Sequence, residues 1–163
     1  MMNFKFYGKD SNNNIYLDNG ASTLPLLDVL NKGLSIIKKY KSVHRGAGFN
    51  SDISTQAYED SRSLILNCLD GTKEDVVIFT ANTTDGVNRM AHLIPPKSNI
   101  LISDIEHTSN SLPWRKMHNV TTFKTINGRI NPDNIKLALT NNKNIYMVAI
   151  TLASNISGYI TDI

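Results

Sequence analysis

The stretch Ile100-Leu101-Ile102-Ser103-Asp104-Ile105-Glu106-His107 joins a short apolar run to a polar loop. A brief, continuous apolar run of this kind is typical of a strand that is buried on both faces. The loop that follows carries hydroxyl, carboxylate and imidazole groups directly after the run. In an open parallel sheet, ligands collect beyond the carboxyl ends of the strands, so this junction is a candidate position for a site.

The same alternation of apolar runs and helical patterns extends along the chain. Short apolar runs predict strands at 15–17, 76–79, 100–102, 120–123 and 145–150. Helical spacing predicts helices over 83–93, 113–118 and 133–139, and Asn127-Gly128 has the composition of a turn. Strands that alternate with helices indicate an α/β fold, with a parallel-rich sheet and helices on both of its faces.

The domain organisation follows from this pattern. Residues 1–14 are interpreted as an N-terminal arm, and residues 15–70 as a helical segment with one helix from Pro25 and another from 53 to 69. Residues 71–163 are expected to form the first part of an α/β domain. Because no closing helix follows the last strand, we expect the chain to be the front part of something longer, or a truncated product.

The composition is that of a globular protein with a core, with 40% hydrophobic and 19% charged residues in a chain of 163. A formal net charge of +3 is too small to indicate a nucleic-acid partner. One cysteine excludes a disulfide framework within the chain. The longest apolar-leaning run, 145–153, is far short of the roughly 20 residues that span a bilayer. We therefore expect a soluble, cytoplasmic protein without a membrane partner.

The segment Thr80-Ala81-Asn82-Thr83-Thr84-Asp85-Gly86 lies between a predicted strand and a predicted helix. The hydroxyls of Thr83 and Thr84, together with the free N–H groups of a helix N-terminus, would suit a phosphate. A purely structural interpretation is also open: Thr83 caps its helix, and Asp85 complements the helix dipole.

Two further loops follow predicted strands. His107 could stack on a flat ligand or exchange protons, although a loop histidine can also be merely solvated. Asn155 could donate to a ligand oxygen or could satisfy its own turn. Three polar loops at one edge of one sheet are stronger evidence for a site than any single loop.

The remaining candidate motifs give weaker evidence for a functional site. Gly46-x-Gly48 follows a basic helix end rather than a strand, so we reject it as a dinucleotide-binding fingerprint. Cys68 is interpreted as a buried small hydrophobe rather than a nucleophile, and Trp114 as a core or interface residue. His92 and His118 have no partner at ligand spacing, so no metal site is expected.

Taken together and in order, these segments resemble the class V aminotransferase family, most closely its cysteine desulfurase and selenocysteine lyase branch. The resemblance runs from residue 15 to the C-terminus and rests on the set rather than on one motif. The matching segments are residues 16–23, 43–46, 78–80 with 83–88, 102–107 with Pro113-Trp114, and Ser154-Asn155 with Gly158.

The resemblance implies a type I fold, that of the large domain of aspartate-aminotransferase-like enzymes, and pyridoxal 5′-phosphate (PLP) as cofactor. It implies that Thr83 and Thr84 hold the cofactor phosphate, and that His107 stacks on the pyridine ring and takes part in proton transfer. Asn155 would contact the ring hydroxyl or the substrate carboxylate. The loops around Ala21 and His44-Arg45 would line the substrate entrance.

It also implies a homodimer, a cysteine or selenocysteine substrate and, in the desulfurase branch, a protein that accepts sulfur. In that branch a cysteine thiolate attacks the substrate sulfur and leaves alanine and a persulfide.

The sequence departs from the family pattern at three positions. Asn82 stands where a Gly usually precedes the threonine pair and would tolerate left-handed geometry. Thr108 and Leu152 stand where the branch often has His. The family's Asp-x-x-Gln pair and Schiff-base Lys would follow residue 163, so we expect this chain alone to be inactive.

Two other functions remain open on these residues. The chain could be a non-catalytic remnant or interaction module, or part of another class V enzyme such as a selenocysteine lyase or an aminotransferase. A nucleotide-binding Rossmann-like domain is rejected, because Asn82-Thr83-Thr84 lacks the glycine spacing that a pyrophosphate requires.

Overall fold

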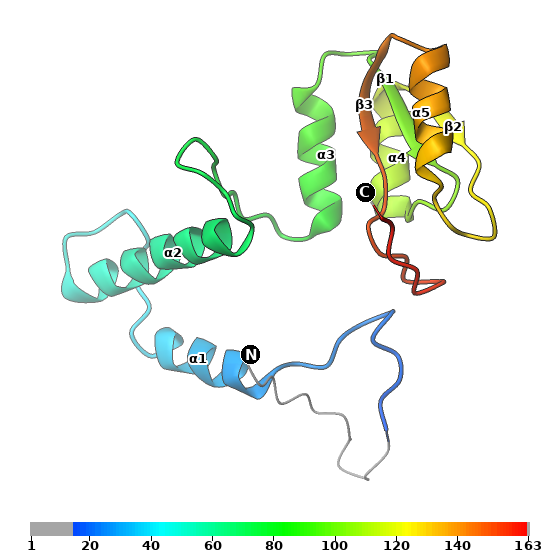
Figure 1. Ribbon diagram of the computed structural model, residues 1–163. Coiled ribbons are helices and arrows are strands. Elements are labelled where there is room, and N and C mark those ends of the chain that lie inside the picture. Colours follow the sequence, from blue (N-terminus) through cyan, green and yellow to red (C-terminus); the bar gives the residue numbers. More distant parts are fainter. Residues whose placement is uncertain (1–14, 163) are drawn as a thin grey trace. The chain divides into compact units, whose positions relative to one another are not determined.

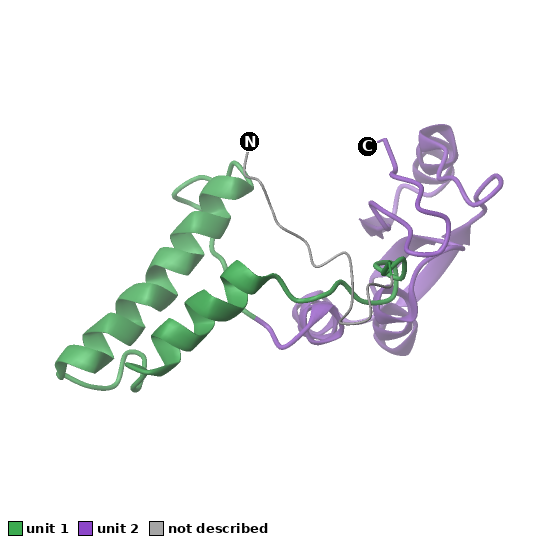
Figure 2. Ribbon diagram, turned by 90° about the horizontal axis from the view of Figure 1, so that it is seen from below, with its two compact units in different colours: residues 1–79 green, residues 80–163 purple. Residues whose placement is uncertain are grey.

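The computed structural model describes residues 15–162, so the predicted arm at 1–14 lies outside the described residues. The chain divides into two compact units, of which the first ends at Phe79 and the second begins at Thr80 (Figure 2). The predicted boundary at 70/71 stays a prediction. Among the described residues, no helix is both long enough and apolar enough to cross a membrane.

The second unit has the predicted α/β architecture (Figure 1). Its sheet has three parallel strands in the order β2-β1-β3. The elements are α3 (Thr83–Leu93), β1 (Asn99–Ser103), α4 (Thr108–Met117), β2 (Asn119–Phe123), α5 (Pro132–Asn141) and β3 (Ile145–Ala149). The chain adds β2 on one side of β1 and then returns to add β3 on the other side. The strand order therefore reverses beside β1, and the boundary of β1 with β3 is where open α/β sheets bind ligands.

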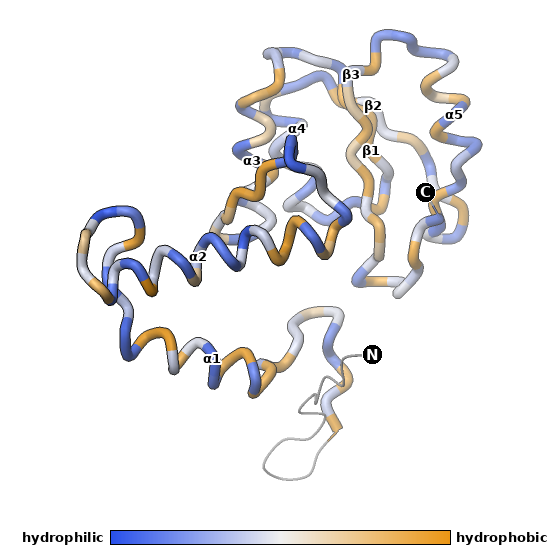
Figure 3. Tube along the Cα trace, turned by 60° about the vertical axis from the view of Figure 1, so that its left-hand side comes forward, coloured by the Kyte–Doolittle hydropathy of each residue, from blue (hydrophilic) through white to orange (hydrophobic). Residues whose placement is uncertain are grey.

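The central strand β1 is buried on both faces, as its continuous apolar run predicts. Ile100 and Ile102 are fully buried and pack with Ala91 of α3 and Trp114 of α4. Leu101 points to the other face of the sheet and packs with a second cluster. That cluster comprises Phe123, Ile130 and, less deeply buried, Ile135 and Ala138 of α5. Helices therefore cover both faces of the sheet, and the hydropathy colouring shows the apolar run of β1 between them (Figure 3).

The structure corrects one detail in the second unit and confirms another. Helix α4 begins at Thr108, five residues before the predicted start at Pro113, because His107 caps its first turn. Asn127 and Gly128 form the predicted turn, with φ angles of 51° and 71°.

The first unit contains the two predicted helices, α1 (Leu27–Ile37) and α2 (Phe49–Cys68). Helix α2 begins four residues earlier than predicted. Side chains of α2 hold the loop that precedes it: the Ser54 hydroxyl accepts from the Lys41 N–H at 2.9 Å, and the Ser51 hydroxyl donates to the Ser42 carbonyl at 2.7 Å. These hydrogen bonds hold the loop against the N-terminal turns of α2.

Three predictions in the first unit are wrong. Residues 76–79 form no strand, and Ile78 is 75% exposed. They belong to a unit whose described residues contain no sheet, so their backbone has no ladder to join. Of the strand predicted at 15–17, only Ile15 forms a bridge, and residues 16–17 are irregular. Cys68, in the last turn of α2, is exposed rather than buried.

Candidate functional site

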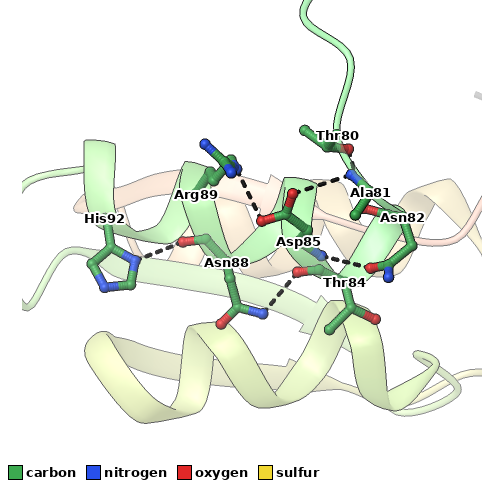
Figure 4. Close-up of polar contacts among 8 residues, drawn as sticks. All are labelled: Thr80, Ala81, Asn82, Thr84, Asp85, Asn88, Arg89 and His92. Carbon is green, nitrogen blue, oxygen red and sulfur yellow. Dashed lines mark hydrogen bonds and ion pairs between the residues drawn. The ribbon is translucent and has the colours of Figure 1, made fainter.

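The N-terminus of α3 is organised by Asn82 and Asp85 (Figure 4). The Asn82 side chain accepts a hydrogen bond from the Asp85 N–H at 2.9 Å, so Asn82 is the N-cap. In return, the Asp85 carboxylate accepts from the Ala81 N–H at 3.2 Å. This reciprocal pattern resembles a capping box. The interpretation of Thr83 as the cap is therefore wrong. Asn82 has an extended backbone (φ −169°), so its tolerance of left-handed geometry is not used.

Capping by Asn82 leaves the two threonines available to a ligand. Thr83 and Thr84 are the first two residues of α3, and both are exposed. Among the hydrogen bonds of residues 15–162, none involves either hydroxyl. The N–H groups of the first helical turn also lack intrahelical partners. Two hydroxyls and two N–H groups at the positive end of a helix form a donor set that fits a phosphate.

The charge of Asp85 beside this donor set is balanced locally. Arg89, one turn further along α3, donates from Nε to Asp85 Oδ1 at 2.9 Å. The hydrogen bond from Arg89 and that from the Ala81 N–H hold the pKa of the Asp85 carboxyl below its ordinary value. An anion at the threonine pair would therefore meet an acid that is already paired.

His107 lies directly before α4, at the carboxyl edge of the sheet. Its Nδ1 accepts from the Ser109 N–H at 3.2 Å and lies 2.8 Å from the Ser109 hydroxyl. Because Nδ1 is an acceptor, the neutral ring carries its proton on Nε2. The residue is exposed, and within the part of the chain that the structure describes, its Nε2 makes no hydrogen bond. The cap thus orients the ring and leaves one edge for a ligand.

A cavity of about 290 Å³ brings Thr84 and His107 together. Thr84 and Asn88 line it from α3, and residues of α4 line its other side. Lys116, in the last turn of α4, also borders the cavity. Sequence spacing did not single out Asn88 or Lys116, because neither directly follows a strand.

Asn155 lies in an exposed turn after β3. The turn is closed at its base, where the Ser154 N–H donates to the Tyr159 carbonyl at 3.0 Å and the Gly158 N–H donates to the Ser154 carbonyl at 2.8 Å. The guanidinium of Arg129 stacks on the Tyr159 ring at 4.9 Å and links the turn to the hairpin at 126–129. Asn155 does not line the cavity that Thr84 and His107 share.

Glu106 connects the loop of His107 to the loop of Asn155, and the sequence analysis did not single it out. Its Oε1 accepts from the backbone N–H of Thr151, just after β3, at 3.0 Å. Its position three residues after the end of a buried strand is the sequence feature that could have marked it as a site residue. Asp104 makes a comparable link to the loop after β2, where it accepts from the Thr125 hydroxyl at 2.8 Å.

The three predicted entrance residues all belong to the first unit. Ala21 lies in an exposed turn in which its N–H donates to the Asp18 carbonyl at 3.2 Å. His44 adopts a left-handed conformation (φ 56°), and its Nε2 lies 2.9 Å from Glu59 Oε1 on α2. Arg45 is the next residue and is exposed. Since each unit is defined by itself, the role of these residues at an entrance stays a prediction.

The sequence matches the Aminotransferase class-V family over residues 15–163. The chain therefore belongs to the class V aminotransferase family. The described α/β unit is consistent with the incomplete PLP-dependent transferase fold expected from its sequence.

The relatives that match are named as cysteine desulfurases. A "probable cysteine desulfurase" of Streptomyces coelicolor is 28% identical, over 91% of this chain and 39% of the relative. The cysteine desulfurase of Wigglesworthia glossinidia brevipalpis is 33% identical, over 88% of this chain and 38% of the relative. This chain thus spans about two fifths of the length of these relatives.

Solved structures of cysteine desulfurases also match this chain. The apo cysteine desulfurase from Thermococcus onnurineus NA1 superposes with a TM-score of 0.81 at 26% identity, over 93% of this chain and 40% of that chain. A cysteine desulfurase from Escherichia coli matches with a TM-score of 0.68 at 23% identity, which supports the fold alone.

Proposed function

We propose that this chain supplies the first part of the PLP-binding domain of a cysteine desulfurase. The observation that carries the proposal is the cavity between α3 and α4 that Thr84 and His107 share, because His107 stands at the edge where a parallel sheet binds ligands. The names of the similar proteins point to the same activity. In this reaction L-cysteine and an enzyme thiol give L-alanine and an enzyme persulfide.

The residues present fit PLP in their chemistry. The donors of Thr83 and Thr84 at the α3 N-terminus would bind the phosphate. The exposed His107 ring, held at Nδ1 by Ser109, would pack on the pyridine ring and hold or release a proton at Nε2. Asn155 would donate to the ring hydroxyl or to the substrate carboxylate. When bound, PLP supplies an electron sink for charge that develops at the substrate Cα.

The substrate entrance is proposed to involve Ala21, His44 and Arg45. The cation of Arg45 suits the carboxylate of an amino-acid substrate. The contact of His44 with Glu59 would fix the conformation of this loop.

The proposal includes a homodimer for the full-length gene product. Helix α1 carries an exposed apolar row at helical spacing. The row consists of Leu27, Leu30, Leu34 and Ile37. An exposed stripe of this kind supports an association with further protein surface. A protein that accepts the persulfide sulfur would be a second, transient partner.

We also propose that residues 1–163 alone do not complete the reaction. None of their lysines stands directly after a buried strand in a Ser-x-His-Lys context, which is the family setting of the Schiff-base lysine. The lysine beside the cavity, Lys116, lies in the last turn of α4 instead.

Alanine formation tests the proposed function. The full-length gene product is incubated with PLP, L-cysteine and a thiol reductant, and alanine and sulfide are quantified in parallel with a reaction on L-selenocysteine. The proposal predicts equimolar alanine and sulfide from cysteine, and none from residues 1–163 alone. Alanine from selenocysteine only would assign a selenocysteine lyase, and no product from either would favour a non-catalytic protein.

A further inference from the structure

The carboxylate of Glu106 is the meeting point of three donors from three positions in the second unit. Its Oε1 accepts from the Ser103 hydroxyl at the end of β1 and from the Thr151 N–H after β3, the latter at 3.0 Å. Its Oε2 accepts from Asn110 Nδ2 on α4 at 2.7 Å. An ionised carboxylate accepts only, so it satisfies all three donors at once.

This cluster is anchored in the core. Ser103 is 1% exposed, so the donor at the end of β1 is fixed. Asn110 in turn accepts from the Trp114 indole N–H at 3.1 Å, and Trp114 is 1% exposed between α4 and the sheet. Glu106 is thus connected through Ser103 and Asn110 to buried residues of β1 and α4.

The position of the cluster relates it to the proposed site. Glu106 immediately precedes His107, and Thr151 lies four residues before Asn155 in the chain. The hydrogen bond between Glu106 and the Thr151 N–H spans the boundary of β1 with β3, where the strand order reverses. It is therefore a direct connection between the loops that carry the two residues.

We propose that Glu106 is a positioning residue that holds the His107 loop and the Asn155 loop in register for PLP. The assignment of PLP rests on the proposed function, whereas the connection between the loops does not. Glu106 acts through the two loops and is not itself a contact to the cofactor.

The geometry requires a carboxylate of this length. A glutamine places an N–H₂ group where one oxygen now accepts, so the Thr151 N–H or Asn110 Nδ2 would face another donor. An aspartate is one methylene shorter and cannot span from the loop to both α4 and β3. Glu106→Gln is thus nearly isosteric and leaves at least one of the three donors without an acceptor.

The test compares Glu106→Gln with Glu74→Gln, which removes the same charge from an exposed position in the first unit. PLP binding to the full-length gene product is measured by quenching of Trp114 fluorescence and by the cofactor absorbance. We expect Glu106→Gln to weaken binding about tenfold, as do losses of the groups that orient metal ligands, and Glu74→Gln to leave binding unchanged. Equal affinities in the two variants would overturn the proposal.

A double-mutant cycle separates positioning from a general structural role. If Glu106 acts through His107 and Asn155, Glu106→Gln has a smaller effect in a His107→Ala/Asn155→Ala background than in the wild type. Fully additive effects would contradict the proposed positioning.

Hydrogen exchange tests the connection without PLP. In Glu106→Met, which keeps the length of the side chain but has no carboxylate oxygen, the peptide that spans residues 150–159 exchanges faster, while the peptide that contains β1 keeps its protection. Asn110→Ala keeps the Glu106 carboxylate and leaves 150–159 protected, which controls for a general loss of structure. Unchanged exchange at 150–159 in Glu106→Met, or equal loss in both variants, overturns the proposal. A wild-type protein that binds no PLP refutes the proposed function, while the exchange data still decide the role of Glu106.

Discussion

Asn82 accepts a hydrogen bond from the Asp85 N–H at 2.9 Å and thereby closes the first turn of α3. This relationship assigns capping to Asn82, and within residues 15–162 the hydroxyls of Thr83 and Thr84 have no hydrogen-bond partner. The segment that the sequence marks as either a cap or an anion site therefore contains a cap and still presents the donors of the proposed anion site. Asn82 caps the helix, whereas the neighbouring Thr83 and Thr84 are the residues proposed to bind the anion.

Replacement of the cap should destabilise the second unit. Asn82→Ala removes the acceptor for the Asp85 N–H, and we expect a loss of about 1 kcal/mol in the free energy of unfolding. Asn82→Ser keeps a capping oxygen and should remain within a few tenths of a kcal/mol of the wild type. Urea denaturation followed by circular dichroism measures both. Equal stability of the Ala and Ser variants would show that the cap contributes nothing.

The stability of α3 should depend on pH through Asp85. The hydrogen bond from Arg89, followed by that from the Ala81 N–H, lowers the pKa of this carboxyl from its ordinary value of 3.8. A lowered folded-state pKa means that ionised Asp85 stabilises the protein above pH 3.8, and that the contribution is lost as the pH falls through the lowered pKa.

Asp85→Asn should therefore be less stable than the wild type at neutral pH, and the difference should shrink in acid. Thermal melts at pH 7 and pH 3 measure it, with Asp133→Asn in the first turn of α5 as the control. A difference that is the same at both pH values would contradict the role of the charged form.

Two substitutions of His107 should separate its structural and chemical roles. Asn is a good N-cap, so His107→Asn should keep the cap of α4 but lose the ring. His107→Ala should lose both, at a cost of about 0.5–2 kcal/mol in stability. With PLP added to the full-length gene product, both variants should change the cofactor absorbance and slow turnover, but only His107→Ala should melt earlier. A wild-type spectrum and rate in His107→Asn would remove the ring from the site.

Because helices cover both faces of the sheet, shortening a core side chain should strongly lower the free energy of unfolding. Ile102 is fully buried against α3 and α4, so Ile102→Ala should cost about 2–5 kcal/mol in the free energy of unfolding. Ile156 is 88% exposed, and Ile156→Ala should change stability by less than about 0.5 kcal/mol. Denaturant titrations of the two variants measure the contrast. Similar losses in both would mean that β1 is not the centre of the core.

The fold of the second unit was predictable because its strands are short, carry apolar runs and are separated by helical patterns. The apolar residues 100–102 predict a central strand, and β1 in the structure is one residue longer at each end. The prediction failed for 76–79, where an equally apolar run has no strand to pair with among the described residues. An apolar run shows that a segment can form a strand. Whether the strand forms depends on a partner strand that is distant in the sequence.

The site was predictable only in part. The sequence predicts a strand before each of Thr84 and His107. Only the strand before His107, β1, is present among the described residues, yet the structure brings both residues to one cavity. The role of Glu106 was not predictable, because its partners Thr151 and Asn110 are defined by side-chain geometry across two strands. The start of α4 was missed for a similar reason: histidine is an unusual N-cap, and Pro113 offered a more familiar start signal.

The most direct test of the account is the affinity of the full-length gene product for PLP, measured by equilibrium dialysis. The wild type is compared with Thr83→Ala/Thr84→Ala, and Thr121→Ala/Thr140→Ala serves as the matched control, since both of its threonines are exposed. The account predicts at least a tenfold loss of affinity in the first variant, because a hydrogen bond to a charged group contributes about 1.5–3 kcal/mol, and no loss in the control. Equal affinity in all three proteins would contradict the assignment of the α3 N-terminus as the phosphate site.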